Sequence, residues 1–190
     1  MERVIKTDRL VLRPITLEDA PAFSKLAGDF DIAKMTGSIP SPFPVLSAEV
    51  RTMMFEAAWR QHTEYSYAIS IDGGALMGEL SLFKRKGESG FELGYWLGRP
   101  YWGHGYMTEA CQALIETAEN SLGLTHIKAG VFEDNPGSIR ILEKLGFEGL
   151  GPEADYFSIA RLCKAKSLGF IRRKSTAPLH AGPHAAIESA

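Results

Sequence analysis

The chain has 190 residues and a formal net charge of -2, with 45% hydrophobic and 23% charged residues. This composition is ordinary for a globular protein, and the length suffices for one sizeable core. The charge gives no general attraction to nucleic acid or to an anionic membrane, and no stretch approaches the roughly 20 apolar residues of a membrane span. Cys111 and Cys163 lack the spacing of a disulfide framework or a zinc site, so we expect no metal and a cytoplasmic protein.

The first third of the chain predicts one strand and two helices. Apolar alternation favours a strand over residues 9–13, and helical spacing follows over residues 17–28. Residues 36–46 hold three prolines and a glycine, which indicate a loop. A second helix is expected over residues 47–61. Its apolar stripe is expected to consist of Val50, Met54, Ala57 and Ala58.

The middle of the chain has the pattern of an antiparallel meander. Three strands are expected over residues 65–71, 75–83 and 91–97, separated by an Asp-Gly-Gly turn at residues 72–74 and a second reversal at residues 84–90. This order of elements argues against a parallel βαβ unit at the start of the domain.

The last part of the chain predicts two helices, three strands and a tail. The expected elements are a long helix over residues 106–122, a strand over 126–132, a short helix over 138–145 and a final strand pair over 156–160 and 168–172. Residues 175–190 show no periodicity and are expected to form a disordered tail. We therefore expect a single domain over residues 1–174.

The most informative local feature is a glycine-rich turn before the long helix, YWGHGY at residues 101–106. A helix N-terminus leaves N–H groups unpaired, and glycine lets an anion approach them closely. The turn therefore predicts a phosphate or pyrophosphate site, although a tight turn with glycines for geometry alone would have the same pattern. Gly-Lys-Ser/Thr is missing, which excludes a P-loop, and Thr108 replaces the third glycine of a dinucleotide fingerprint.

Three sequence blocks resemble the GNAT superfamily of N-acetyltransferases, most closely the branch of the ribosomal-protein acetyltransferases RimJ and RimL. The blocks are TDRLVLRP at residues 7–14, YWL at 95–97 with YWGHGYMTEA at 101–110, and VFEDNPGSIRILEKLGF at 131–147. The resemblance covers roughly residues 7–172. It implies an α+β fold in which a mixed, mostly antiparallel sheet of six to seven strands is splayed in the middle and flanked by about four helices.

The resemblance also implies that acetyl-CoA lies in the splay of the sheet. Backbone groups of Trp96 and Leu97 would pair with its pantetheine arm, one N–H there would polarise the thioester carbonyl, and Asn135 and Ser138 would contact the cofactor. Asn135 could instead be only a helix cap. The pyrophosphate would be held by the turn, which consists of Trp102, Gly103, His104, Gly105, Tyr106 and Met107.

The expected chemistry is attack of an amine on a thioester, for which the amine must lose a proton. Glu92 is the first candidate for the base and Glu79 the second, although either could be an ordinary strand glutamate. Ser138 stands where the resembling branch has a serine proposed to protonate the leaving thiolate, and its alternative role is a helix N-cap. Tyr156 is a second candidate donor. His104 is expected to face phosphate or solvent, without a chemical role.

The sequence thus predicts acetyl transfer from acetyl-CoA to a primary amine, either a protein N-terminus or a small molecule. Two alternatives stay open: an inactive acyl-CoA-binding sensor with the same fold, and a nucleotide-dependent oxidoreductase that uses the glycine turn. A homodimer is implied by the resemblance alone. The segments expected to line the acceptor pocket carry the least motif content, so the identity of the amine is not predicted.

Overall fold

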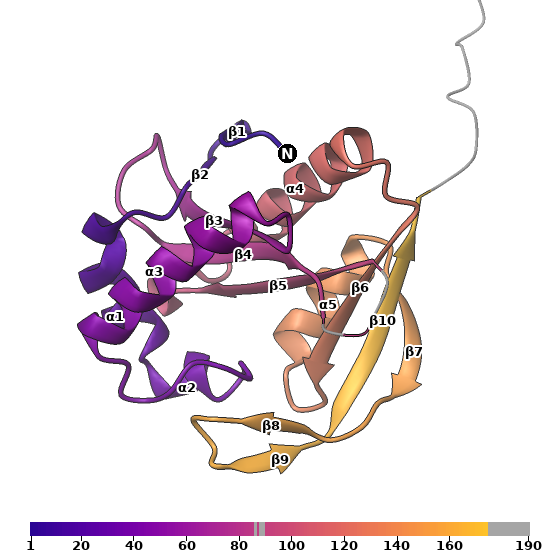
Figure 1. Cartoon of the computed structure of the whole chain (residues 1–190). Helices are drawn as coiled ribbons and strands as arrows, with labels where there is room; N and C mark the ends of the chain where they lie inside the picture. The colour runs from indigo at the N-terminus through magenta and orange to yellow at the C-terminus, as the bar shows by residue number, and fades with distance from the viewer. Residues whose placement is uncertain (86, 88–89, 175–190) are drawn as a thin grey trace, which may run out of the picture.

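The computed structural model describes residues 1–85, 87 and 90–174, so the predicted tail lies outside the described residues. Its main sheet has eight strands: β1 (Ile5–Lys6), β2 (Val11–Arg13), β3 (Glu64–Ser70), β4 (Gly78–Phe83), β5 (Phe91–Leu97), β6 (His126–Phe132), β7 (Glu148–Pro152) and β10 (Ser167–Arg173). They lie in the order β1-β2-β3-β4-β5-β6-β10-β7 (Figure 1). The predicted fold class is confirmed, with eight strands in place of six to seven.

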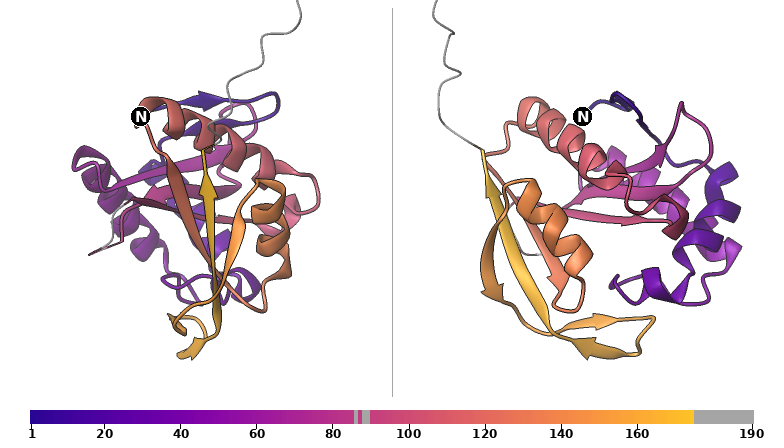
Figure 2. Two further views of the ribbon diagram at one scale, coloured as in Figure 1. Left: turned by 90° about the vertical axis from the view of Figure 1, so that its right-hand side faces the viewer. Right: turned by 180° about the vertical axis from the view of Figure 1, so that it is seen from behind.

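Helices cover both faces of the sheet (Figure 2). The described helices are α1 (Ala20–Ala27), α2 (Phe30–Ala33), α3 (Val45–Arg60), α4 (Tyr106–Ser121) and α5 (Pro136–Lys144), with short 3-10 turns η1 (Leu17–Asp19) and η2 (Arg99–Tyr101). α1, α2 and α3 lie on one face, and α4 and α5 lie on the other. No described helix is both long and apolar enough to cross a bilayer.

Two apolar cores hold these layers together. Between the sheet and α4, the buried residues Ala110, Leu114 and Ala118 recur at helical spacing and let the helix approach the strands closely. On the other face, Phe23 of α1 stacks on Trp96 of β5 with ring centroids 5.1 Å apart. β5 is therefore buried on both sides, and its position relative to α1 and α4 is fixed.

The sheet opens between β5 and β6. All pairings in the sheet are antiparallel except this parallel one, which covers only two positions, Phe91 with Ile127 and Glu92 with Lys128. Beyond those positions both strands continue without pairing to each other. The backbone of β5 from Leu93 onward therefore has no strand partner on its β6 side among the described residues, as the predicted splay requires.

The predicted apolar stripe of the second helix is wrong. Val50 and Met54 are 45% and 64% exposed, and the residues of α3 that are buried are Ala48, Thr52 and Phe55. The helix turns a mixed face toward the sheet, because part of that face borders a polar cavity and not the core. Apolar spacing alone therefore selected the wrong side of the helix.

The predicted final strand pair is also wrong. β8 (Tyr156–Ser158) pairs with β9 (Cys163–Ala165) in a separate two-stranded sheet. β10 instead lies between β6 and β7 and is antiparallel to both. A short hairpin thus interrupts the chain between two strands of the main sheet and projects from its lower edge in Figure 1.

Candidate active site

The glycine turn, residues 102–107, joins η2 to the start of α4. Gly103 and Gly105 have left-handed backbone conformations with φ of 80° and 78°, which glycine adopts without the strain that a Cβ would bring. A Cβ at Gly103 would meet nothing within 4 Å among the described residues. The turn is therefore open on the side to which a side chain at Gly103 would point.

The main-chain amides of the turn are unpaired. Gly105 is the N-cap of the 16-residue helix α4 and offers no side chain to cap it. Within the described part of the chain, the N–H groups of residues 103–107 donate to no acceptor. Such an array, reinforced by the partial positive charge of a helix N-terminus, is a site for an anion such as a pyrophosphate.

The segment before β2 holds the glycine turn in place. Arg9 Nη1 donates to the His104 carbonyl at 2.9 Å, and the Arg9 guanidinium lies 4.8 Å from the centre of the Tyr106 ring. Thr7 Oγ1 and the Arg9 N–H both donate to Glu109 Oε1, at 2.6 and 3.0 Å. Burial would raise the pKa of Glu109, but the hydrogen bonds from Thr7 and Arg9 lower it overall. The same contacts place a guanidinium beside the unpaired amides.

The end of β5 offers main-chain groups to the opening in the sheet. The Gly98 N–H donates at 2.8 Å to the carbonyl of the residue that precedes β4. Because backbone groups alternate along a strand, those of Trp96 face β4, while those of Tyr95 and Leu97 face away from it. The Leu97 carbonyl already accepts from Trp102 Nε1 at 2.6 Å, so the indole ties the turn to the strand.

A pair of hydroxyl groups spans the opening. Tyr95 Oη, from β5, lies 2.7 Å from Ser138 Oγ of α5, and Asn135 Oδ1 accepts from the Ser138 N–H at 3.1 Å. The N-cap of α5 is Asn135, so the alternative role predicted for Ser138 is wrong: it is the third residue of the helix. Burial raises the pKa of the Tyr95 hydroxyl, which keeps it protonated.

Glu79 and Glu92 lie on neighbouring strands, on the sheet face that α1 and α3 cover. Glu79 pairs across the strands with Trp96, whereas Glu92 lies four residues before Trp96 on the same face. Gly94 stands between them on β5, where a Cβ would meet the Phe83 ring at 3.0 Å. At Gly94 the strand thus presents only main-chain atoms. This position lies about 7 Å along the strand direction from Glu92 and from Glu79.

The two carboxylates have different surroundings. Glu79 is only 3% exposed and accepts from Trp96 Nε1 at 2.9 Å. Burial raises its pKa, against the opposing effects of Arg51 and of the Trp96 hydrogen bond. Glu92 Oε2 accepts from Arg85 Nη2 at 2.7 Å. The pKa of Glu79 is therefore raised, whereas Glu92 already has a guanidinium partner.

Both carboxylates line a cavity of about 430 Å³, which we call the sheet-face cavity. That volume is in the usual range for a small-molecule site, roughly 300–1,000 Å³. Its walls include residues 35–39, the side chains of Arg51, Met54 and Phe55 from α3, and Tyr156 from β8. Tyr156 packs so closely on Gly37 that a Cβ there would lie 2.2 Å from its ring, so the hairpin closes the cavity on that side.

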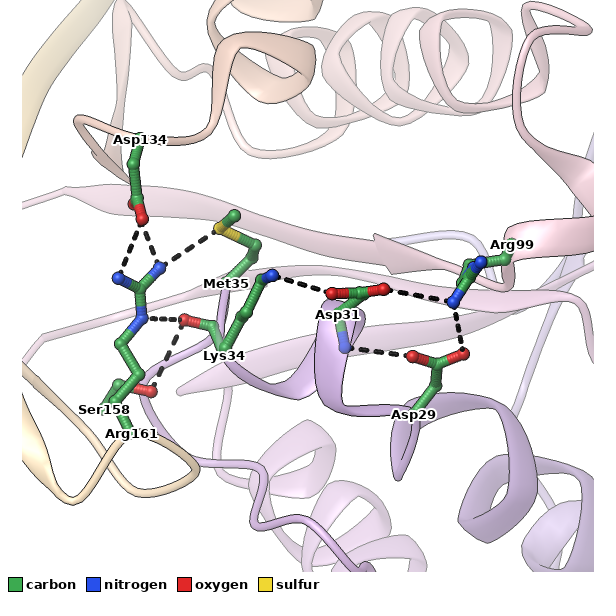
Figure 3. A network of polar contacts seen from close by, with 8 residues as sticks. All are labelled: Asp29, Asp31, Lys34, Met35, Arg99, Asp134, Ser158 and Arg161. Atoms are coloured by element: carbon green, nitrogen blue, oxygen red, sulfur yellow. Dashed lines mark hydrogen bonds and ion pairs between the residues drawn. The ribbon is translucent and has the colours of Figure 1, made fainter.

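A polar network holds two of these walls together (Figure 3). Arg161, between β8 and β9, binds both carboxylate oxygens of Asp134 at 2.9 Å, and its Nε donates to the Lys34 carbonyl at 2.6 Å. Arg99 of η2 contacts Asp31 of α2 at 3.0 Å. The hairpin, the loop after β6 and the segment that begins the cavity wall are therefore joined through one guanidinium.

A family model described as an acetyltransferase (GNAT) domain matches residues 9–148. The chain belongs to the GNAT acetyltransferase family. The uncharacterized N-acetyltransferase p20 of Bacillus licheniformis is 30% identical over 151 residues, which cover 79% of this chain and 85% of that protein. The predicted family membership is confirmed, and these matches favour neither the sensor nor the oxidoreductase.

Solved structures of family members share the fold. A GNAT acetyltransferase from Bacillus anthracis superposes with a TM-score of 0.77 at 22% identity, over 90% of this chain and 98% of that one. RimJ of Mycobacterium smegmatis, solved in complex with CoA-disulfide, gives a TM-score of 0.78 at 21% identity, over 89% of this chain and 84% of that one. This chain therefore has the GNAT family fold, and its structural neighbours include members of the RimJ and RimL branch.

The residues fit coenzyme A at the glycine turn. The unpaired amides suit a diphosphate, the free main-chain edge of β5 suits an amide-containing arm, and Ser138 and Tyr95 lie where the sheet opens. In the described part of the chain, no group of three or more His, Cys, Asp or Glu side chains could hold a metal ion.

Three functional candidates were not assigned from the sequence: Arg9, Arg51 and Tyr95. Arg9 and Tyr95 lie inside the motif blocks, but their contacts reach residues 95 and 43 positions away. Arg51 lies on the helix whose inward face was predicted wrongly. The sequence did place Tyr95 next to the expected splay, where a tyrosine can reach across the opening. Sequence spacing does not say toward which face of the sheet its side chain points.

Proposed function

We propose that this chain transfers the acetyl group of acetyl-CoA to a primary amine by direct attack in a ternary complex. The observation that carries the proposal is the array of unpaired amides at residues 103–107, because it sits at the end of the strand that also borders the sheet-face cavity. A donor bound along β5 and an amine in the cavity would meet at the opening of the sheet.

The main chain is proposed to hold the donor. The amides of residues 103–107 bind the pyrophosphate, with the Arg9 guanidinium nearby. Alternation along β5 supports Leu97 and Tyr95, more than Trp96, as the residues whose backbone pairs with the pantetheine arm. Acetyl-CoA supplies an activated acyl group as a thioester, and an N–H on this edge can polarise its carbonyl.

We propose Glu79 as the group that takes the proton from the amine, with Glu92 as the second candidate. An α-amine has a pKa near 7.7–8.0 and a lysine near 10.4, so a proton must be removed or shed before attack. Burial raises the pKa of Glu79, which makes its carboxylate a stronger acceptor for that proton. Glu92 already accepts from Arg85, which leaves it less available.

Ser138 is proposed to donate a proton to the leaving thiolate, and Tyr95 to orient the Ser138 hydroxyl. The 2.7 Å contact between their oxygens supports this pairing. Asn135 is proposed to use its remaining amide group on the pantetheine while its Oδ1 caps α5. Tyr156 lies in the cavity wall and His104 stacks on Tyr106, and neither is given a chemical step.

The compartment of the reaction is proposed from the two cysteines. Cys111 and Cys163 are both free thiols, which supports a reducing compartment, and we propose the cytoplasm. The absence of nucleic-acid, metal and membrane partners, and the homodimer, stay predictions.

The test is amine-dependent release of thiol from acetyl-CoA, measured for Glu79→Gln and Glu92→Gln over roughly pH 6–9. We expect Glu79→Gln to lower kcat by about 100-fold and to flatten the rise of rate with pH, and Glu92→Gln to lower it by about 10-fold or less. Unchanged coenzyme A affinity would show that both variants are folded. An unaltered profile for Glu79→Gln would remove it as the base, and an unaltered rate for Glu92→Gln would remove Glu92.

A further inference from the structure

The sheet-face cavity contains a guanidinium that donates no hydrogen bond to a carboxylate among the described residues. Arg51, on α3, extends into the cavity beside Glu79, but its Nε lies 4.0 Å from the nearest Glu79 oxygen. Within the described residues this Nε is buried and has no hydrogen-bond partner. Buried donors in proteins are almost always paired, so the Arg51 guanidinium has hydrogen-bonding capacity that the described residues leave unused.

The other contacts of Arg51 hold it in place without neutralising it. Its Nη1 donates to the Ser38 hydroxyl at 3.1 Å, and its guanidinium lies 5.2 Å from the centre of the Phe55 ring. Both partners are uncharged. Glu79 accepts a hydrogen bond from Trp96 Nε1, whereas the Arg51 Nε stays 4.0 Å from the nearest Glu79 oxygen. Arg51 is therefore a fixed guanidinium whose charge faces the cavity.

The opposite requirement comes from the carboxylates. Glu79 and Glu92 flank the bare backbone at Gly94, where the reacting amine would enter, and they suit an ammonium or amine group. The guanidinium and the carboxylates thus lie in one cavity and call for a ligand with both kinds of charge. Guanidinium binds carboxylate particularly well, because its N–H groups match the two oxygens of the ligand.

We propose that the acceptor is a small amphoteric amine, of the class of free α-amino acids and their derivatives, whose carboxylate binds Arg51 while its amine lies near Glu79. This inference rests on the proposed acetyl transfer. A small molecule matches the cavity volume of about 430 Å³, and the packing of Tyr156 on Gly37 and the bond from the Ile159 N–H to the Gly37 carbonyl bound the cavity on the hairpin side.

The experiment compares acceptors that differ only in the carboxylate. Common L-amino acids, each paired with its α-amide, and several short peptides are assayed for thiol release from acetyl-CoA. An α-amide has the less basic amine and is the more reactive of the two without recognition. We expect the best amino acid to exceed its amide by at least about tenfold in kcat/KM, as one charge-assisted pair requires.

Variants of α3 assign the effect to Arg51. Arg51→Gln should lower kcat/KM for the amino acid by about 10- to 100-fold and for the amide by less than about threefold, with an unchanged KM for acetyl-CoA. Arg51→Lys should retain part of the preference. Arg60→Gln is the matched control, because Arg60 lies on the same helix with a side chain 78% exposed and outside the cavity, and it should change neither acceptor.

The outcomes separate the two proposals. Acetylation of amides or peptides as fast as amino acids, or an equal loss on both acceptors in Arg51→Gln, overturns the amphoteric acceptor and leaves acetyl transfer standing. If no amine releases thiol although acetyl-CoA binds, acetyl transfer itself fails, and the acceptor inference falls with it.

Discussion

The glycine turn and the sheet-face cavity both lie along β5, but they are made of different parts of the chain. The turn is one run of residues, 102–107, and it presents main-chain N–H groups. The cavity gathers side chains from α3, β4, β5, β8 and the loop after α2, which are far apart in sequence. A main-chain site depends on conformation, whereas a side-chain site depends on the identity of each residue at its wall.

This difference has a consequence for how the protein can vary. Any residue that allows the turn conformation leaves the anion site intact, so side chains there can change at little cost. In the cavity, a single change of charge alters which acceptor fits. A common donor and a variable acceptor therefore follow from the same fold.

The largest expected effect is at the contact that joins the two regions. Ser138→Ala should lower kcat by about 100-fold, because it removes the proposed proton donor, and Tyr95→Phe by about 10-fold, because the donor loses its orienting partner. Initial rates with both substrates saturating give the measurement. Ser121→Ala, at the exposed end of α4, is the control. Equal rates for Ser138→Ala and the unaltered protein would show that the hydroxyl pair takes no part in the reaction.

A smaller effect is expected from the contacts that hold the turn. Glu109→Gln should weaken coenzyme A binding by about tenfold and lower the free energy of unfolding by about 1–2 kcal/mol at pH 7, since it weakens the charged hydrogen bonds from Thr7 and Arg9. Calorimetry and denaturant unfolding measure the two effects. Glu116→Gln, an exposed residue of the same helix, should change neither.

The stability effect of Glu109 has a defined pH dependence. Its pKa in the folded protein is lowered, so the carboxylate contributes stability above its unfolded pKa, near 4.3, and this contribution is lost as the pH falls through the folded value. The difference in unfolding free energy between Glu109→Gln and the unaltered protein should therefore shrink in acid. A difference that stayed constant from neutral pH to about pH 3 would mean that the charge of Glu109 is irrelevant.

The smallest effect tests whether the two regions are separable. Arg161→Ala should raise the acceptor KM by about fivefold, because the hairpin loses its bonds to Asp134 after β6 and to the Lys34 carbonyl, while coenzyme A affinity stays the same. Arg173→Ala is the control, since its side chain is 60% exposed and forms an ion pair with the exposed Glu148. A loss of coenzyme A affinity in Arg161→Ala would mean that the cavity walls and the turn are coupled.

The same contrast explains which features the sequence predicts. The turn, the meander and the helix after Gly105 depend on neighbouring residues, and those predictions agree with the structure. The predicted apolar stripe of α3 is wrong because Val50 and Met54 are apolar yet exposed. The predicted partner of β8 is wrong because a short strand can pair with several others. Arg51 could not be assigned a role from the sequence, because that role depends on Glu79 and Ser38, which only the fold brings beside it.

The central claim is that main-chain amides of the glycine turn hold the pyrophosphate, and calorimetry of coenzyme A with matched glycine variants tests it most directly. Gly103 and Gly73 have φ of 80° and 76°, and no atom of the described residues comes within 4 Å of either Cβ position, so the backbone strain of Gly103→Trp and Gly73→Trp is comparable. We predict that Gly103→Trp weakens binding by at least about 100-fold, while Gly73→Trp and His104→Ala change it by less than about threefold. Unchanged affinity in Gly103→Trp would contradict the account.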